Sequence, residues 1–149
     1  MITYADKEQA RYWPVSKELM AQYRDGSHTR KSSFGDLIWA QNDQHQYQYH
    51  RDGDKPAIIC IDGMLTWYQN GQRHRDGDKP AFIGRDSHLE WYKNGDQHRI
   101  CGPAAICSDG ELKWWINGKD ITPEVRKWLN RKRWRGTPEQ IFEFQLKFV

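Results

Sequence analysis

The chain has 149 residues, of which 29% are charged, with a net charge of +3 and a mean hydropathy of −1.01. This length fits one domain, and no segment approaches the roughly 20 consecutive apolar residues of a membrane span. Eight Trp, seven Tyr and five Phe residues supply the area for a thin core in an otherwise polar chain. We therefore predict a polar domain with a shallow aromatic core, and exclude a membrane-spanning protein.

Residues 1–34 are predicted to form an N-terminal extension with a short helix. This helix begins at the cap residue Ser16 and carries Leu19, Met20 and Tyr23 on one side. The opening letters MITYADKEQARYW lack the apolar region of a signal peptide. The three cysteines are an odd number without C-x-x-C spacing, which favours reduced thiols and gives no zinc pattern. We expect a cytoplasmic protein.

Residues 35–118 contain an internal repeat. The first unit, from His50, is HRDGDKPAIICIDGMLTWYQNGQ, and the second, from His74, is HRDGDKPAFIGRDSHLEWYKNGD. A third unit with a degraded start, HRICGPAAICSDGELKWWINGKD, begins at His98. A half-unit, GDLIWAQND at 35–43, precedes them and is joined to the first unit through HQYQY at 45–49. The chain therefore repeats one structural element three and a half times.

Each unit is predicted to be a β-hairpin with one apolar face. After the corner proline of the first unit, Ala57, Ile59 and Ile61 would point to one side of a strand and Ile58 and Cys60 to the other. Asp62-Gly63 is then a strong two-residue turn signal. Asn70-Gly71 and its two counterparts are further turns that accept positive φ. Four apolar positions recur on one face, namely Ala57/Ala81/Ala104, Ile59/Ile83/Ile106, Leu65/Leu89/Leu112 and Trp67/Trp91/Trp114. We predict a mainly β fold, a meandering antiparallel sheet of tandem β-hairpin repeats with flanking helices capping the sheet.

The letters HRD at His50 and His74 also begin the catalytic loop of protein kinases. That loop carries a metal-binding asparagine five residues after its aspartate, but Ala57 and Ala81 stand at those positions here. The chain also lacks a G-x-G-x-x-G phosphate loop and a D-F-G motif. We therefore interpret HRDGDKPA as a polar corner between hairpins, where the glycine permits the bend and the proline begins the next strand.

The pattern HRDGDKPA…DG…L-x-WY-x-NG resembles the MORN-like hairpin repeats of phage, giant-virus and bacterial proteins. The third unit, with Gly102-Pro103-Ala104, is most similar to the GPA form of that repeat, and the first two units insert a lysine before the proline. The resemblance covers residues 35–130. It implies a repeat sheet and a binding role, as in toxin neutralisers or membrane-proximal scaffolds, with a host-cell cytoplasmic location if the protein is phage-encoded.

Residues 119–149 are predicted to form a basic helical cap and a C-terminal tail. Thr122-Pro123-Glu124 is a helix start with Thr122 as the N-cap, and Val125, Trp128 and Leu129 form an apolar stripe. This helix is expected to cover the open edge of the sheet. The tail TPEQIFEFQLKFV begins like a helix, whereas Phe142, Phe144, Leu146 and Phe148 alternate as in a strand; we favour a helix.

Two surfaces are candidate binding sites. Tyr68, Tyr92 and Trp115 lie opposite the tryptophan stripe, so they are core residues if a helix covers that face and a protein-binding patch if none does. Residues Lys119–Arg135 carry a net charge of +5, with Trp128 and Trp134 interleaved. That segment predicts either a solvated cap or a nucleic-acid site with stacking help. The nucleic-acid candidates are Arg126, Lys127, Arg131, Lys132, Arg133 and Arg135.

Nothing in the sequence indicates catalysis, a metal or a cofactor. The corner histidines recur, which favours hydrogen bonding to turns over acid–base chemistry, and the Asp52/Asp54 and Asp76/Asp78 pairs lack the other ligands of a calcium loop. The leading hypothesis is a phage-type accessory protein that binds and inhibits a host defence or toxin protein through its repeat sheet. Nucleic-acid binding is the alternative, and self-assembly through a sheet edge is a third hypothesis.

Overall fold

The computed structural model describes residues 2–43 and 46–149. Within this part the chain forms four helices and sixteen short strands. The helices are α1 (Tyr4–Tyr12), α2 (Lys17–Tyr23), α3 (Thr122–Leu129) and α4 (Pro138–Phe148). The strands are β1 (Arg30–Lys31), β2 (Leu37–Ile38), β3 (Ala40–Asp43), β4 (Gln46–Tyr49), β5 (Ile58–Ile59), β6 (Leu65–Thr66), β7 (Tyr68–Gln69), β8 (Gln72–Arg73), β9 (Phe82–Ile83), β10 (Leu89–Glu90), β11 (Tyr92–Lys93), β12 (Asp96–Gln97), β13 (Ala105–Ile106), β14 (Leu112–Lys113), β15 (Trp115–Ile116) and β16 (Lys119–Asp120).

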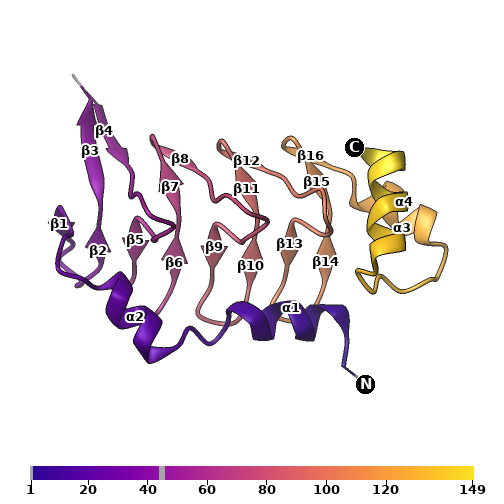
Figure 1. The fold of residues 1–149 in the computed structure, drawn as a ribbon, viewed down its shortest axis with the longest axis horizontal. Coiled ribbons are helices and arrows are strands. Elements are labelled where there is room, and N and C mark those ends of the chain that lie inside the picture. Colours follow the sequence, from indigo (N-terminus) through magenta and orange to yellow (C-terminus); the bar gives the residue numbers. More distant parts are fainter. Residues whose placement is uncertain (1, 44–45) are drawn as a thin grey trace.

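The described residues contain an antiparallel sheet of eight strands in the order β1-β2-β5-β6-β9-β10-β13-β14. Each full repeat contributes two neighbouring strands, and equivalent residues of successive units fall in register, as in the pairing of Leu65 with Ile83 and of Leu89 with Ile106. The sheet begins at Arg30, inside the predicted N-terminal extension. The mainly β fold of successive hairpins with flanking helices is confirmed (Figure 1).

Each full unit contains a second hairpin beyond the predicted one. In the first unit, β7 and β8 pair around Asn70 and Gly71, whose φ angles are 49° and 77°. The same turn recurs at the other two Asn-Gly pairs and joins β11 to β12 and β15 to β16. The Asn-Gly signal therefore marks a two-residue turn with positive φ at both positions.

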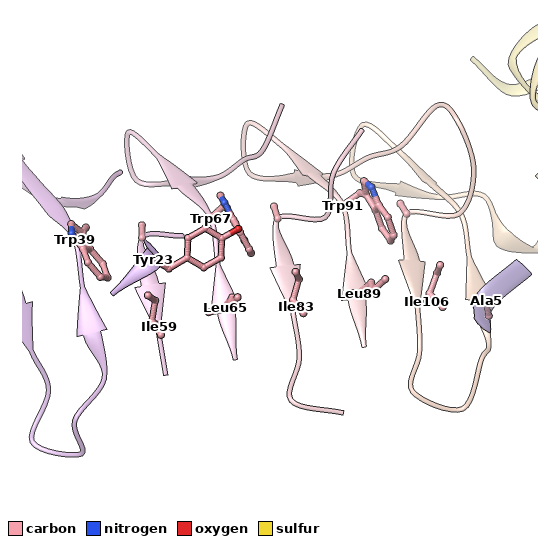
Figure 2. Close-up of a cluster of buried hydrophobic side chains, with 13 residues drawn as sticks. Ala5, Tyr23, Trp39, Ile59, Leu65, Trp67, Ile83, Leu89, Trp91 and Ile106 are labelled. Atoms are coloured by element: carbon pink, nitrogen blue, oxygen red, sulfur yellow. The ribbon is translucent and has the colours of Figure 1, made fainter. Parts of the chain in front are cut away.

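Helices α1 and α2 cover the tryptophan face of the sheet. Figure 2 shows Trp39, Trp67 and Trp91 in one row and Ile59, Leu65, Ile83, Leu89 and Ile106 in another, with Tyr23 and Ala5 beside them. Tyr23 and Tyr12 meet Trp67 and Trp91 edge to face, with ring centroids 6.0 and 6.3 Å apart. The apolar face of the repeats is therefore buried beneath the N-terminal helices.

Helix α1 has no counterpart among the predicted elements, whereas α2 lies where a helix was predicted. The signal for α1 was local: the Thr3 hydroxyl accepts a hydrogen bond from the Asp6 amide, and the Asp6 carboxylate accepts one from the Thr3 amide. Its buried residues include only Ala5 and Glu8. So little apolar patterning gives weak helical periodicity in the sequence.

The C-terminal helices form a second core at the end of the array. Trp114, Val125, Leu129, Trp134 and Phe144 are buried there. The preferred helix for the tail is confirmed as α4, in which Phe144 is buried while Phe142 and Leu146 face solvent. The apolar residues that alternate as in a strand therefore lie on two different faces of the helix.

Thr122 does not cap α3 as predicted. Ile121 is the N-cap, and the Thr122 hydroxyl accepts a hydrogen bond from the Trp114 backbone amide at 2.9 Å. In the preceding units the equivalent amides of Trp67 and Trp91 bond the carbonyls of Ala81 and Ala104. The Thr122 hydroxyl therefore replaces the alanine carbonyl that a further repeat would supply. The sheet ends at β14.

Candidate docking face

The repeated HRDGDKPA corner is a structural unit. His50 Nδ1 accepts a hydrogen bond from the Asn70 amide at 3.0 Å, and His74 Nδ1 accepts one from the Asn94 amide at 3.1 Å. The other ring nitrogen of each histidine contacts the aspartate two residues on, Asp52 or Asp76. Each histidine thereby fastens its corner to the Asn-Gly turn of its own unit.

The arginine of each corner lies over the tryptophan of the unit before it. Arg51, Arg75 and Arg99 stack at 3.6, 3.8 and 3.9 Å from the ring centroids of Trp39, Trp67 and Trp91. Each guanidinium also pairs with a carboxylate, which is Asp25, Asp54 or Asp78 in turn. Each donates to a proline carbonyl as well. The motif thus forms a corner between hairpins, as predicted, and its arginines also join successive units.

The face of the sheet opposite α1 and α2 carries no helix among the described elements (Figure 1). Strand alternation places one row of paired residues along it, namely Arg30, Ile38, Ile58, Thr66, Phe82, Glu90, Ala105 and Lys113. We call this row, together with Tyr68, Arg73, His88, Tyr92 and Trp115, the open face. The question left by the sequence, which side is covered, is answered by the helices packing on the tryptophan side.

Tyr68, Tyr92 and Trp115 are half-buried on the open face. Arg73 joins the two tyrosines, because its Nε donates to the Tyr68 hydroxyl at 3.3 Å and its Nη1 donates to the Tyr92 hydroxyl at 3.2 Å. Tyr49 extends this row beyond Tyr68, at 5.1 Å between ring centroids. Trp115 occupies the equivalent position one unit further along, on β15. The three predicted residues therefore form a ladder across the repeats.

A polar network that the sequence did not reveal lies in the middle of the open face. The Glu90 carboxylate contacts His88 Nε2 at 3.0 Å and accepts a hydrogen bond from the Tyr92 hydroxyl at 2.8 Å. The hydrogen bond to Glu90 raises the pKa of His88. Burial alone raises the pKa of Glu90, but the bonds from His88 and Tyr92 outweigh it, so this pKa is lowered. The network holds an ionic centre between the aromatic residues.

The predicted basic residues are distributed differently from the expectation. Arg126 lies on α3 and pairs with Glu111 at 2.8 Å, whereas Arg131, Lys132, Arg133 and Arg135 lie in the α3–α4 linker. Trp134 is buried, and Trp128 packs edge to face on Phe148 at 5.7 Å. Stacking of bases on these two tryptophans, as the sequence had suggested, is therefore not supported.

No protein-family model, curated protein or solved structure matches this chain. Residues 2–43 and 46–149 contain no group of three or more His, Cys, Asp or Glu side chains arranged to hold a metal ion. Across the same residues, no helix has both the length and the apolar character needed to cross a membrane. The three cysteines are free thiols. The geometry of the chain itself must therefore support any functional proposal.

Proposed function

We propose that this chain is a non-catalytic binding protein that docks a partner protein on its open face. The observation that carries the proposal is the half-buried aromatic ladder of Tyr68, Tyr92 and Trp115 on the open face. That face carries no described helix, whereas α1 and α2 cover the other one. Tyrosine, tryptophan and arginine are the residues that most often dominate the binding energy of protein interfaces. A broad sheet that presents them at regular intervals suits a macromolecular surface better than a small ligand.

The rigidity of the ladder supports this role. Arg73 lies 5.2 Å from the Tyr92 ring centroid and 5.6 Å from that of Phe82, so it is held between the aromatic residues that flank it. Side chains that are fixed before binding lose less conformational entropy when a partner arrives. The open face is therefore preorganised for contact.

The inhibitory role rests on the resemblance to MORN-like repeats. On that basis we propose a phage-type accessory protein whose partner is a host defence factor or a toxin, met in the host cytoplasm. Self-assembly through a sheet edge is less well supported. The edge strand β1 carries exposed Arg30 and Lys31, and like charges disfavour pairing with a second copy. The opposite edge strand is β14, and beyond it the Trp114 amide is already bonded to the Thr122 hydroxyl.

The proposal is tested by affinity capture from bacterial lysate with and without nuclease treatment, followed by reconstitution with the purified captured protein. The variant Y68S/Y92S removes two aromatic side chains of the ladder and should weaken binding at least about 30-fold, since even a single hot-spot residue contributes about 2 kcal/mol or more. The matched control F142S/L146S removes two exposed aromatic and aliphatic side chains from α4 and should bind like the parent.

Thermal melts of each variant establish that the sheet remains folded. If Y68S/Y92S is unstable, F82K places a charge on the open face, where Phe82 is half-buried, and should abolish binding instead. A partner that binds both open-face variants as tightly as the parent would rule out this face. Capture that disappears with nuclease would favour nucleic acid over protein.

A further inference from the structure

The linker between α3 and α4 borders two adjoining hollows on the surface. One, of about 550 Å³, is lined by Arg131, Lys132, Arg133, Arg135, Thr137 and Gln140. The other, of about 470 Å³, is lined by Ile2, Thr3, Tyr4, Lys7, Arg133, Trp134 and Arg135. We call the two together the basic hollow. It is lined by five cationic side chains and no carboxylate.

The cations of the basic hollow differ from those of the repeats in their partners. Arg51, Arg75 and Arg99 each pair with an aspartate in the corners. Among the residues that the structure describes, Lys7, Arg131, Lys132 and Arg135 form no ion pair. Arg126, on α3, is neutralised by Glu111. The charges of Lys7, Arg131, Lys132 and Arg135 therefore remain available to an anion.

The backbone of the α3–α4 linker is fixed by packing and by hydrogen bonds. Trp134 is buried between Tyr4, Trp114 and Phe144, with edge-to-face centroid distances of 6.2, 6.0 and 5.8 Å. Gln140 accepts a hydrogen bond from the Arg135 amide at 2.7 Å and donates one to the Arg133 carbonyl at 3.1 Å. The side chains at the rim thus project from a fixed backbone.

We propose that the basic hollow binds consecutive phosphates of a nucleic-acid backbone without regard to base sequence. Three of its cations are arginines, whose planar guanidinium groups bind phosphate oxygens in pairs. Two adjoining hollows that share Arg133 and Arg135 accommodate more than one phosphate. The exposed tryptophan faces needed for stacking on unpaired bases are missing from the described linker, so the contact is with the backbone alone.

The position of the hollow suits a long polyanion. Helices α3 and α4 lie at one end of the array, beyond β16 (Figure 1). A nucleic acid held there avoids the exposed corner carboxylates, such as Asp52 and Asp76. An anionic membrane is a poorer match, because the exposed apolar residues Phe142 and Leu146 share α4 with Glu139 and Glu143.

Fluorescence anisotropy with a labelled 20-base-pair DNA duplex, across a salt series, tests the proposal. The parent should bind with a Kd of about 10⁻⁶ to 10⁻⁴ M near physiological salt, as expected for phosphate contacts alone. The variant R131Q/K132Q/R135Q should bind at least tenfold more weakly. The slope of log K against log salt should fall in magnitude by about 2 to 3.

The control K17Q/R24Q/R30Q removes the same kinds and number of charges from the opposite end of the array and should leave binding within about twofold. A single strand and an unrelated duplex sequence should bind comparably to the first probe. Equal losses of DNA affinity in the two triple variants would mean that net charge alone explains binding, and would overturn the proposed site. Failure of the parent protein to bind DNA at low salt would also overturn it.

Discussion

Replacing Arg99 by methionine should destabilise the protein far more than the same change at Arg75, its equivalent in the preceding repeat. Both guanidinium groups stack on a tryptophan and pair with an aspartate. Each also contacts a tyrosine hydroxyl, Tyr23 for Arg75 and Tyr4 for Arg99. Arg99 alone donates in addition to Glu8, at 3.0 Å. The two sites therefore differ mainly in the carboxylate that loses its arginine partner.

The difference in free energy follows from the carboxylates. The Glu8 side chain is 7% exposed, so R99M leaves a buried charge whose remaining partner is Arg11. Removing one member of a buried ion pair costs about 3 to 5 kcal/mol. Asp54 is 42% exposed and retains Lys79 at 2.7 Å, so water and lysine compensate for R75M. We expect about 1 to 2 kcal/mol there, comparable to an exposed pair plus the lost stacking.

Urea unfolding followed by tryptophan fluorescence and far-UV circular dichroism measures both variants against the parent. The double variant E8Q/R99M, which neutralises the orphaned charge, should recover at least about 1 kcal/mol relative to R99M. Equal destabilisation of R99M and R75M, or no recovery in the double variant, would refute the claim that the buried Glu8 makes the third corner different.

Three further predictions concern the sheet end, pH and thiol reactivity. T122V should lower the free energy of unfolding by about 1 to 3 kcal/mol, because it leaves the buried Trp114 amide without its acceptor; T122S, which keeps the hydroxyl, should retain most of the stability in a thermal melt. The raised pKa of His88 contributes stability that is complete below its ordinary value of 6.5 and is lost as pH rises through the higher folded value. Between about pH 6 and pH 8 the loss should stay below about 1 kcal/mol, since both partners are partly exposed, and E90Q should remove this pH dependence from urea titrations. Burial raises the pKa of Cys60 to about 11, so on the order of 0.1% of this thiol is ionised at pH 8. Its reaction with a thiol reagent should therefore be much slower than that of a free thiol, and reaction at the free-thiol rate would contradict the burial.

The repeat architecture can be predicted from the amino-acid sequence, because a two-residue period and regularly spaced turn residues are local properties. Ile59, Leu65 and Trp67 could be assigned to one face from alternation alone, and all three are buried. The Asn-Gly pairs specified tight turns for the same reason. The tail required more care, since its apolar spacing fits two periods, and the Thr-Pro-Glu start correctly favoured the helix.

Which face of the sheet is covered, and which charges are paired, depend on contacts between distant parts of the chain. No local pattern indicates where α1 packs, so which face is covered depends on contacts between residues about 80 positions apart, such as that between Tyr12 and Trp91. His88, Glu90 and Tyr92 alternate along one stretch of chain, but the contact of Tyr92 with Arg73 on β8 joins residues of neighbouring hairpins and forms only in the folded chain. Thr122 has the residue type of a helix cap, but its hydroxyl instead accepts a hydrogen bond from the Trp114 amide, which has no further strand to pair with. Buried polar groups must find partners wherever the fold places them, and for that reason these assignments depend on the folded chain.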